Sequence, residues 1–179
     1  MEELLPLTFT LLASGLLGLM CYQDWQARSI SWPAFPALAV ALLGVRLGRL
    51  PAVQVGAELL LSWTGLGLLL AALWLYVRLR FRSLRLRECL GSGDVLYWAI
   101  AAVYFSPIGF LTYFIGSSLV ALLVAAALYW RQTPSAEATH IPLAGVQAAC
   151  LLVLLGLQAV APVRMAYWAD SALSIAWTP

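Results

Sequence analysis

The chain has 179 residues, of which 63% are hydrophobic and only 10% are charged, and its mean hydropathy is +0.91. One water-soluble core cannot bury so much apolar surface, which excludes a soluble globular domain and predicts an integral membrane protein. The net charge of +2 is too small to indicate a nucleic-acid partner, and every basic residue is arginine. The three cysteines lack metal-type spacing, so we predict neither a disulfide framework nor a metal site.

Long apolar runs predict an all-α, polytopic membrane helix bundle with about six transmembrane helices, in a single domain that covers residues 1–179. The expected spans are residues 4–21, 32–47, 55–77, 94–106, 108–130 and 141–161, followed by an interfacial tail at 162–179. The acidic N-terminus lacks the basic region of a secretory signal, so we expect the first span to be permanent.

Two features of the spans affect the interpretation. Residues 92–106 would rise only about 22 Å, less than a bilayer core of about 30 Å, so one end of this helix is expected to lie below the membrane surface. Arg46, Arg49, Gln54 and Glu58 flank a short loop. We interpret them as an interfacial charge cluster whose side chains reach water.

The arginines predict the orientation. Six spans put seven of them on one side, namely Arg28, Arg78, Arg80, Arg82, Arg85, Arg87 and Arg131, and three on the other, namely Arg46, Arg49 and Arg164. The positive-inside rule places the first set in the cytoplasm and both termini on the non-cytoplasmic side. The segment 78–87 alternates basic and apolar residues, and we expect it to lie on anionic lipid headgroups.

A carboxylate lies at the start of the fourth span, in Gly91-Ser92-Gly93-Asp94. An acid in this position is costly to keep ionised and marks a functional site by default. Asp24 falls on the same predicted face, and packing the first and fourth helices side by side would bring the two acids together. Such a pair shares a proton, so that one carboxylate activates water while the other polarises a carbonyl. Gly91 and Gly93 are expected to allow unusual backbone dihedrals and close approach of a substrate backbone.

Each aspartate also has a purely structural interpretation. Asp24 and Arg28 are four residues apart and could form a salt bridge on a continuing helix. Asp94 could cap the backbone amides at a helix start. His140, the single histidine, is interpreted as an interfacial residue rather than a metal ligand.

At these residues the chain resembles the bacterial type IV prepilin peptidases (type 4 leader peptidases), which are membrane aspartic proteases of the GxGD type. Three stretches carry the resemblance: the GxGD motif at 91–94, the stretch 24–33 with its Asp, Arg and Ile, and Ile141-Pro142-Leu143-Ala144-Gly145 at the start of the last span. The likeness covers residues 12–157, in the short form of the family.

The resemblance implies an aspartic endopeptidase that removes the short basic leader from type IV prepilins or type II secretion pseudopilins. It implies cleavage at the cytoplasmic face of the bacterial inner membrane, with no cofactor. Asp24 and Asp94 would be the catalytic pair, with Gly91 and Gly93 supporting it. The remaining candidates are Arg28, Ile141 and Pro142 as site-lining residues, and Glu88 and Glu137 as contacts for the basic leader.

The chain departs from the family pattern at three points. Leu96 stands where the family commonly has Lys, and Ser31-Trp32 replaces the usual Pro-Asn. The cysteine-containing cytoplasmic domain associated with N-methylation is absent, so we expect no methyltransferase activity and no use of S-adenosylmethionine. These departures leave a catalytically silent membrane scaffold as an alternative. A small proton-coupled transporter is a further alternative. The predicted location of both acids at one membrane face argues against it, because a proton relay needs carboxylates deeper in the membrane.

Overall fold

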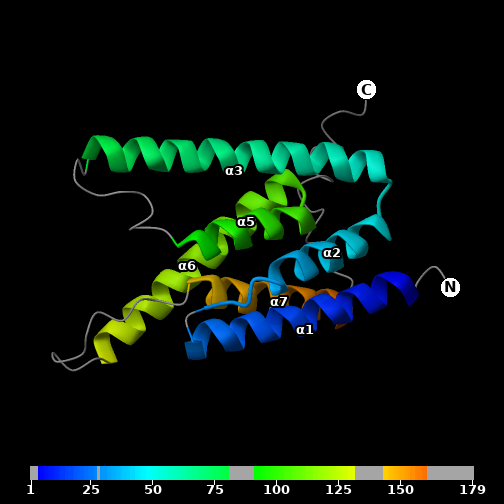
Figure 1. The fold of residues 1–179 in the computed structure, drawn as a ribbon, viewed down its shortest axis with the longest axis horizontal. Coiled ribbons are helices and arrows are strands. Elements are labelled where there is room, and N and C mark those ends of the chain that lie inside the picture. The colour runs from blue at the N-terminus through cyan, green and yellow to red at the C-terminus, as the bar shows by residue number, and fades with distance from the viewer. Residues whose placement is uncertain (1–3, 28, 81–90, 132–142, 161–179) are drawn as a thin grey trace.

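The computed structural model describes residues 4–27, 29–80, 91–131 and 143–160, and these form six helices and no strand (Figure 1). In chain order they are α1 (Leu4–Ala27), α2 (Ala34–Leu47), α3 (Ala52–Arg80), α5 (Ser92–Tyr104), α6 (Pro107–Arg131) and α7 (Leu143–Val160). The predicted all-helical class is confirmed, and each helix falls on one expected span. α1 and α3 both continue beyond their expected ends, so Arg78 and Arg80 lie in the last turn of α3 rather than in a loop.

Three of the helices are long and apolar enough to cross a bilayer, at Pro6–Ala27, Ala52–Arg80 and Pro107–Leu128. This is consistent with a membrane protein. α2 and α7 are shorter apolar helices. α5 has 13 residues and therefore rises about 20 Å at 1.5 Å per residue, which confirms the short helix predicted from the sequence.

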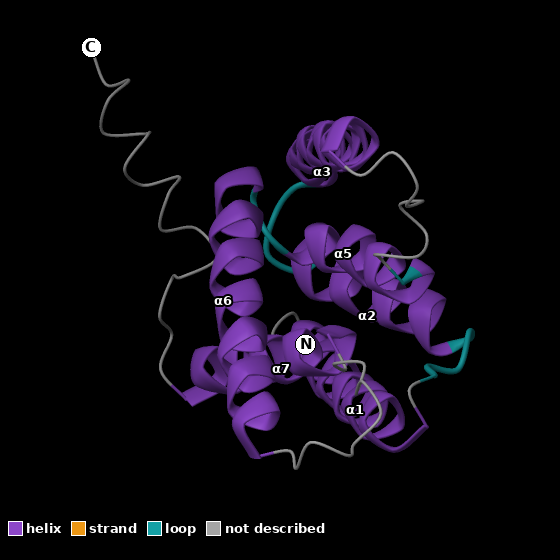
Figure 2. Cartoon of the chain, turned by 90° about the vertical axis from the view of Figure 1, so that its left-hand side faces the viewer, coloured by secondary structure: helices purple, strands orange, loops and turns teal. Residues whose placement is uncertain are grey.

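The core lies where α1 packs against α2 and α7, with α5 on the other side of α2. Its fully buried side chains recur every three or four residues, as expected for helices that bury one stripe. They include Ala13, Leu17 and Met20 of α1, Leu38, Leu42 and Val45 of α2, and Ala148, Leu151 and Leu155 of α7. α3 lies at the outer edge of the bundle (Figure 2), and its buried residues are Val55, Ser62, Leu66 and Val77.

The turn between α5 and α6 forms as the sequence predicts. Ser106 precedes the helix, and its hydroxyl accepts a hydrogen bond from the Gly109 amide at 3.3 Å. Pro107 is the first helical residue. The amide at this position makes no hydrogen bond within the helix, so the lack of an amide hydrogen in proline costs nothing here. Ser106 and Pro107 therefore separate α5 from α6, and the Ser106 hydroxyl caps the start of α6.

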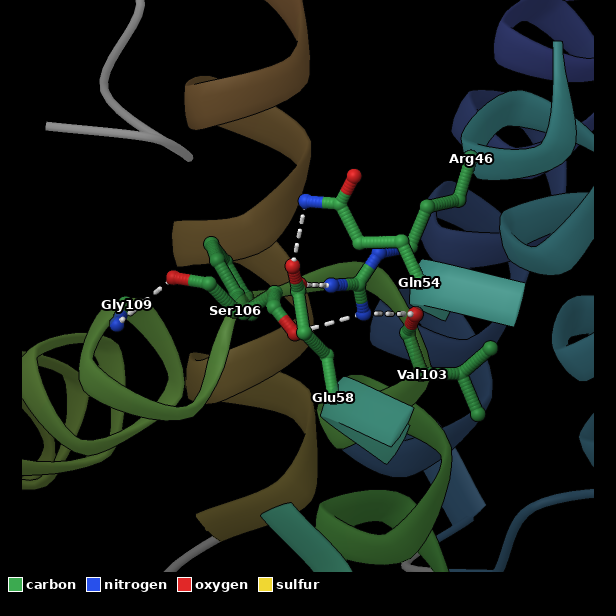
Figure 3. A network of polar contacts seen from close by, with 7 residues as sticks. Arg46, Gln54, Glu58, Val103, Ser106 and Gly109 are labelled. Carbon is green, nitrogen blue, oxygen red and sulfur yellow. Dashed lines mark hydrogen bonds and ion pairs between the residues drawn. The ribbon is translucent and has the colours of Figure 1, made fainter. Parts of the chain in front are cut away.

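The interpretation of Arg46 as an interfacial side chain is wrong. Arg46 is only 1% exposed. Its guanidinium forms an ion pair with Glu58 of α3 and donates to the carbonyl oxygens of Val103 at 3.0 Å and Phe105 at 2.7 Å (Figure 3). These carbonyls end α5, where a cation is favourable to the helix dipole. Arg46 thus joins α2, α3 and α5 inside the bundle, while Arg49 is exposed.

Candidate active site

The two aspartates lie at the same end of the bundle, which we call the site end. Asp24 is in the last turn of α1 and is 8% exposed, whereas Asp94 is in the first turn of α5 and is half-buried. In Figure 1 the C-terminus of α1 and the N-termini of α5 and α7 all lie at the left of the molecule. The expectation that the acids lie on one face of the bundle is therefore met by the structure.

The first turn of α7 brings the acids together, rather than the direct packing of α1 on α5 that the sequence suggested. α1 packs mainly on α2 and α7. The Gly145 amide donates a hydrogen bond to Asp24 Oδ2 at 2.6 Å. The backbone of the preceding residue, Ala144, lies close to the Asp94 carboxyl, and the two aspartates are close enough for their charges to interact. The Gly145 amide therefore holds Asp24, and the residue before it lies beside Asp94, so the first turn of α7 lies next to both carboxyl groups.

The reason these amides are available is their position. The first four amide groups of an α-helix have no carbonyl partner within the helix, and they carry the positive end of its dipole. Ala144 and Gly145 fall within this first turn of α7. A helix start of this kind favours negative charge, so α7 supports an ionised carboxylate in a position that is otherwise largely desolvated.

Gly145 is required here because α1 passes very close. A β-carbon at position 145 would lie 2.8 Å from Asp24 Oδ2 and 3.1 Å from Asp24 Cβ. Both distances are shorter than ordinary van der Waals contact, so no larger residue fits without moving α7 away from α1.

Asp94 also has the structural role that its position suggested. The Gly91 amide lies within reach of its carboxyl, so a side chain three residues into the helix returns to the residue that caps it. The expected unusual dihedrals are absent, since Gly91 has φ −65° and ψ 139°, which any residue adopts, and Gly93 is an ordinary helical residue. What Gly91 provides is space, because a β-carbon there would lie 3.0 Å from Asp94 Oδ2.

Gln23, next to Asp24, stabilises the turn between α1 and α2 through hydrogen bonds to Ser31. Its Oε1 accepts hydrogen bonds from both the amide and the hydroxyl of Ser31, each at 3.0 Å. This side chain was not singled out in the sequence, and neither were Ala144 and Gly145 as site residues. The signal for the latter two was present, because both belong to the Ile-Pro-Leu-Ala-Gly stretch that carries part of the resemblance.

Five predicted site residues lie outside the described residues, namely Arg28, Glu88, Glu137, Ile141 and Pro142. His140, which we interpret as an interfacial residue, lies outside them as well. Leu96 is described, and at 42% exposed it lies away from the packed contact between α5 and α7. Within residues 4–27, 29–80, 91–131 and 143–160, no three His, Cys, Asp or Glu side chains gather as metal ligands would.

The arrangement is suited to proton transfer. Two carboxyl groups that feel each other's charge do not both ionise readily, and they titrate as a pair. One member can then accept a proton from water while the other donates a hydrogen bond.

Comparison of the chain with family models, with curated proteins and with solved structures finds no match.

Proposed function

We propose that the protein is a membrane aspartic endopeptidase of the GxGD type, with Asp24 and Asp94 as its catalytic pair. The observation that carries this proposal is the meeting of the two acids at the first turn of α7, although they are far apart in the sequence. The GxGD motif at 91–94 begins α5 at this point. The resemblance to prepilin peptidases then supplies the substrate class, which is a prepilin or pseudopilin with a short basic leader.

The mechanism follows from a pair that shares one proton. The ionised carboxylate removes a proton from water, whose oxygen attacks the scissile carbonyl carbon. The protonated carboxyl donates to the carbonyl oxygen, which gives a tetrahedral diol. The carboxyl group that took the proton from water then passes it to the amide nitrogen, while one hydroxyl of the diol returns a proton to the other carboxylate. The C–N bond breaks, the leader is released, and the pair again holds one proton. The amides of Ala144 and Gly145 support the negative charge that the pair retains.

We further propose that this occurs at the cytoplasmic face of a bacterial inner membrane. The arginine distribution supports that orientation. A substrate helix in the bilayer would present its leader junction to the site end, where Gly91 and Ser92 are exposed beside Asp94.

The test is cleavage of a pseudopilin precursor by the purified protein in detergent. Asp24→Asn and Asp94→Asn are each expected to lower kcat/KM by at least about a hundredfold, which is typical of losing a general acid or base. Asp170→Asn makes the same chemical change elsewhere in the chain and should cleave at the wild-type rate. Far-ultraviolet circular dichroism and thermal unfolding check that all three variants fold.

Wild-type activity in either Asp24→Asn or Asp94→Asn would remove that residue from the catalytic pair. No cleavage by the wild type would favour a catalytically silent scaffold. Leu96, at the place of the family's usual Lys, is the observation that favours this second candidate.

A further inference from the structure

A buried polar network lies one helical turn deeper in the bundle than the two aspartates, and it joins α5, α6 and α7. The Trp98 indole N–H donates to Gln147 Oε1 at 2.6 Å. The hydroxyls of Tyr97 and Tyr113 are hydrogen-bonded at 2.7 Å, and that of Tyr113 donates to the Gln147 carbonyl oxygen at 2.7 Å. The Gln147 amide nitrogen donates in turn to Ser118 Oγ at 3.4 Å. Gln147 itself is 0% exposed, so it links its own helix α7 to α5 and α6 from a position that water does not reach.

The network shares its helix faces with the site. Trp98 follows Asp94 by four residues on α5, and Gln147 follows Ala144 by three residues on α7. Residues at these spacings lie above one another on one face of a helix. Among the described residues, two side-chain hydrogen bonds join α5 and α7, namely Trp98–Gln147 one turn below the site end and Tyr104–Gln158 at the far end of α5. At the site end itself, the Asp94 carboxyl lies close to the backbone of Ala144.

These polar contacts differ from the surrounding apolar contacts in one respect. Apolar burial is non-directional, so it holds α7 in the bundle without fixing its rotation. A buried amide side chain that loses its partner carries a desolvation cost, so the Trp98–Gln147 bond favours one rotation and one height of α7. The same rotation and height decide where the amides of Ala144 and Gly145 point.

We propose that Gln147 is a positioning residue that, through Trp98, holds the first turn of α7 so that the Ala144 and Gly145 amides meet the two aspartates. This rests on the proposed peptidase function. Gln147 does not contact the substrate and acts through α7. Its loss should therefore lower kcat and leave KM nearly unchanged, because the amides support the charge of the reacting pair rather than substrate binding.

Gln147→Met tests the proposal, since methionine keeps the length of the side chain and removes the acceptor for Trp98. We expect kcat to fall about 10- to 100-fold, as a small misplacement of catalytic groups can produce, with KM within about twofold of wild type. Leu155→Ala is the matched control, because Leu155 is buried on the same helix but deeper in the bundle. It should lower the unfolding temperature and keep kcat.

A second measurement reports on the amide directly. Gly145 is the only glycine that follows an alanine in the sequence, so labelling with carbonyl-13C alanine and 15N glycine selects its amide alone in an NMR spectrum. The Gly145 resonance should shift in Gln147→Met and in Trp98→Phe, which removes the donor. It should stay in place in Leu155→Ala. The double variant should be no slower than the slower single variant, because both remove one link.

The outcomes separate the two proposals. Equal kcat in Gln147→Met and wild type, or an unmoved Gly145 resonance in Gln147→Met and Trp98→Phe, would overturn the positioning role. If Gln147→Met does not fold, Trp98→Phe answers the same question from the other side of the bond. If the wild type does not cleave any precursor, the peptidase proposal fails, and the Gly145 resonance alone decides whether Gln147 positions α7.

Discussion

At the scale of single residues, Gly145 is the position where the smallest change should have the largest effect. In Gly145→Ala the added carbon would lie 3.1 Å from Asp24 Cβ, an atom fixed to the α1 backbone, so movement of the carboxyl group cannot relieve the contact. The start of α7 must shift and weaken the 2.6 Å bond to Asp24. We expect kcat/KM for leader cleavage to fall about tenfold or more.

Gly156→Ala is the control for this change, since it places the same substitution in the same helix at a position with open space. It should retain activity and stabilise α7 slightly, by up to about 1 kcal/mol, because alanine has the higher helix propensity. Equal activity in the two variants would mean that the close approach of α7 to Asp24 has no part in cleavage.

The charge state of the pair gives a second residue-scale prediction. Cleavage needs one ionised and one protonated carboxyl, so the rate should fall at low pH, when both are protonated, and at high pH, when the shared proton is lost. A plot of kcat/KM against pH should be bell-shaped, and its two limbs belong to the pair rather than to either aspartate. A profile with a single limb would contradict the shared proton.

At the scale of helices, the short α5 is held at both ends. Its N-terminal Asp94 meets α7, and its C-terminal carbonyls accept hydrogen bonds from Arg46 of α2. Arg46→Met removes the cation, leaves the carbonyls of Val103 and Phe105 without these donors, and separates Glu58 from its partner. Breaking one side of a buried ion pair costs about 3–5 kcal/mol, and the free energy of unfolding in mixed detergent micelles should fall by this amount.

Arg49→Met makes the same change three residues later, at an exposed position, and should alter the free energy of unfolding by no more than about 0.5 kcal/mol. Replacing both charges, in Arg46→Met with Glu58→Leu, should recover part of the loss because no unpaired buried charge remains. If Arg46→Met and Arg49→Met are equally stable, the ion pair does not hold α5.

Much of this helix-level picture could be predicted from the sequence, and the rest could not, for physical reasons. Long apolar runs and a Ser106-Pro107 break define where helices begin and end. Two predicted spans lie between Asp24 and Asp94, and an even number of crossings returns the chain to the same side of the membrane, so both acids are expected at one end. Which helix packs on which depends on contacts between distant residues, so the bridging role of α7 was not visible. Glu58 is grouped with Arg46 in the sequence, but the carbonyl oxygens at positions 103 and 105, which bury Arg46 at the end of α5, are far along the chain.

At the scale of the whole molecule, the burial of Arg46 sharpens the charge asymmetry between the two ends. The sequence predicts seven arginines on the side of the two aspartates and three on the other side, and one of these three, Arg46, is buried in the protein interior. A buried, paired arginine does not act as a free loop charge toward orientation. The positive-inside rule therefore favours a cytoplasmic site end more strongly than the sequence alone suggested.

Cysteine accessibility tests this orientation in bacterial cells, in a chain whose Cys21, Cys89 and Cys150 are replaced by alanine. Arg49→Cys and Ser92→Cys place single thiols at exposed positions at opposite ends of the bundle. A membrane-impermeant maleimide should label Arg49→Cys in intact spheroplasts and Ser92→Cys only in inside-out vesicles. The reverse pattern would put the aspartates on the outer face, where a substrate whose leader remains in the cytoplasm could not reach them.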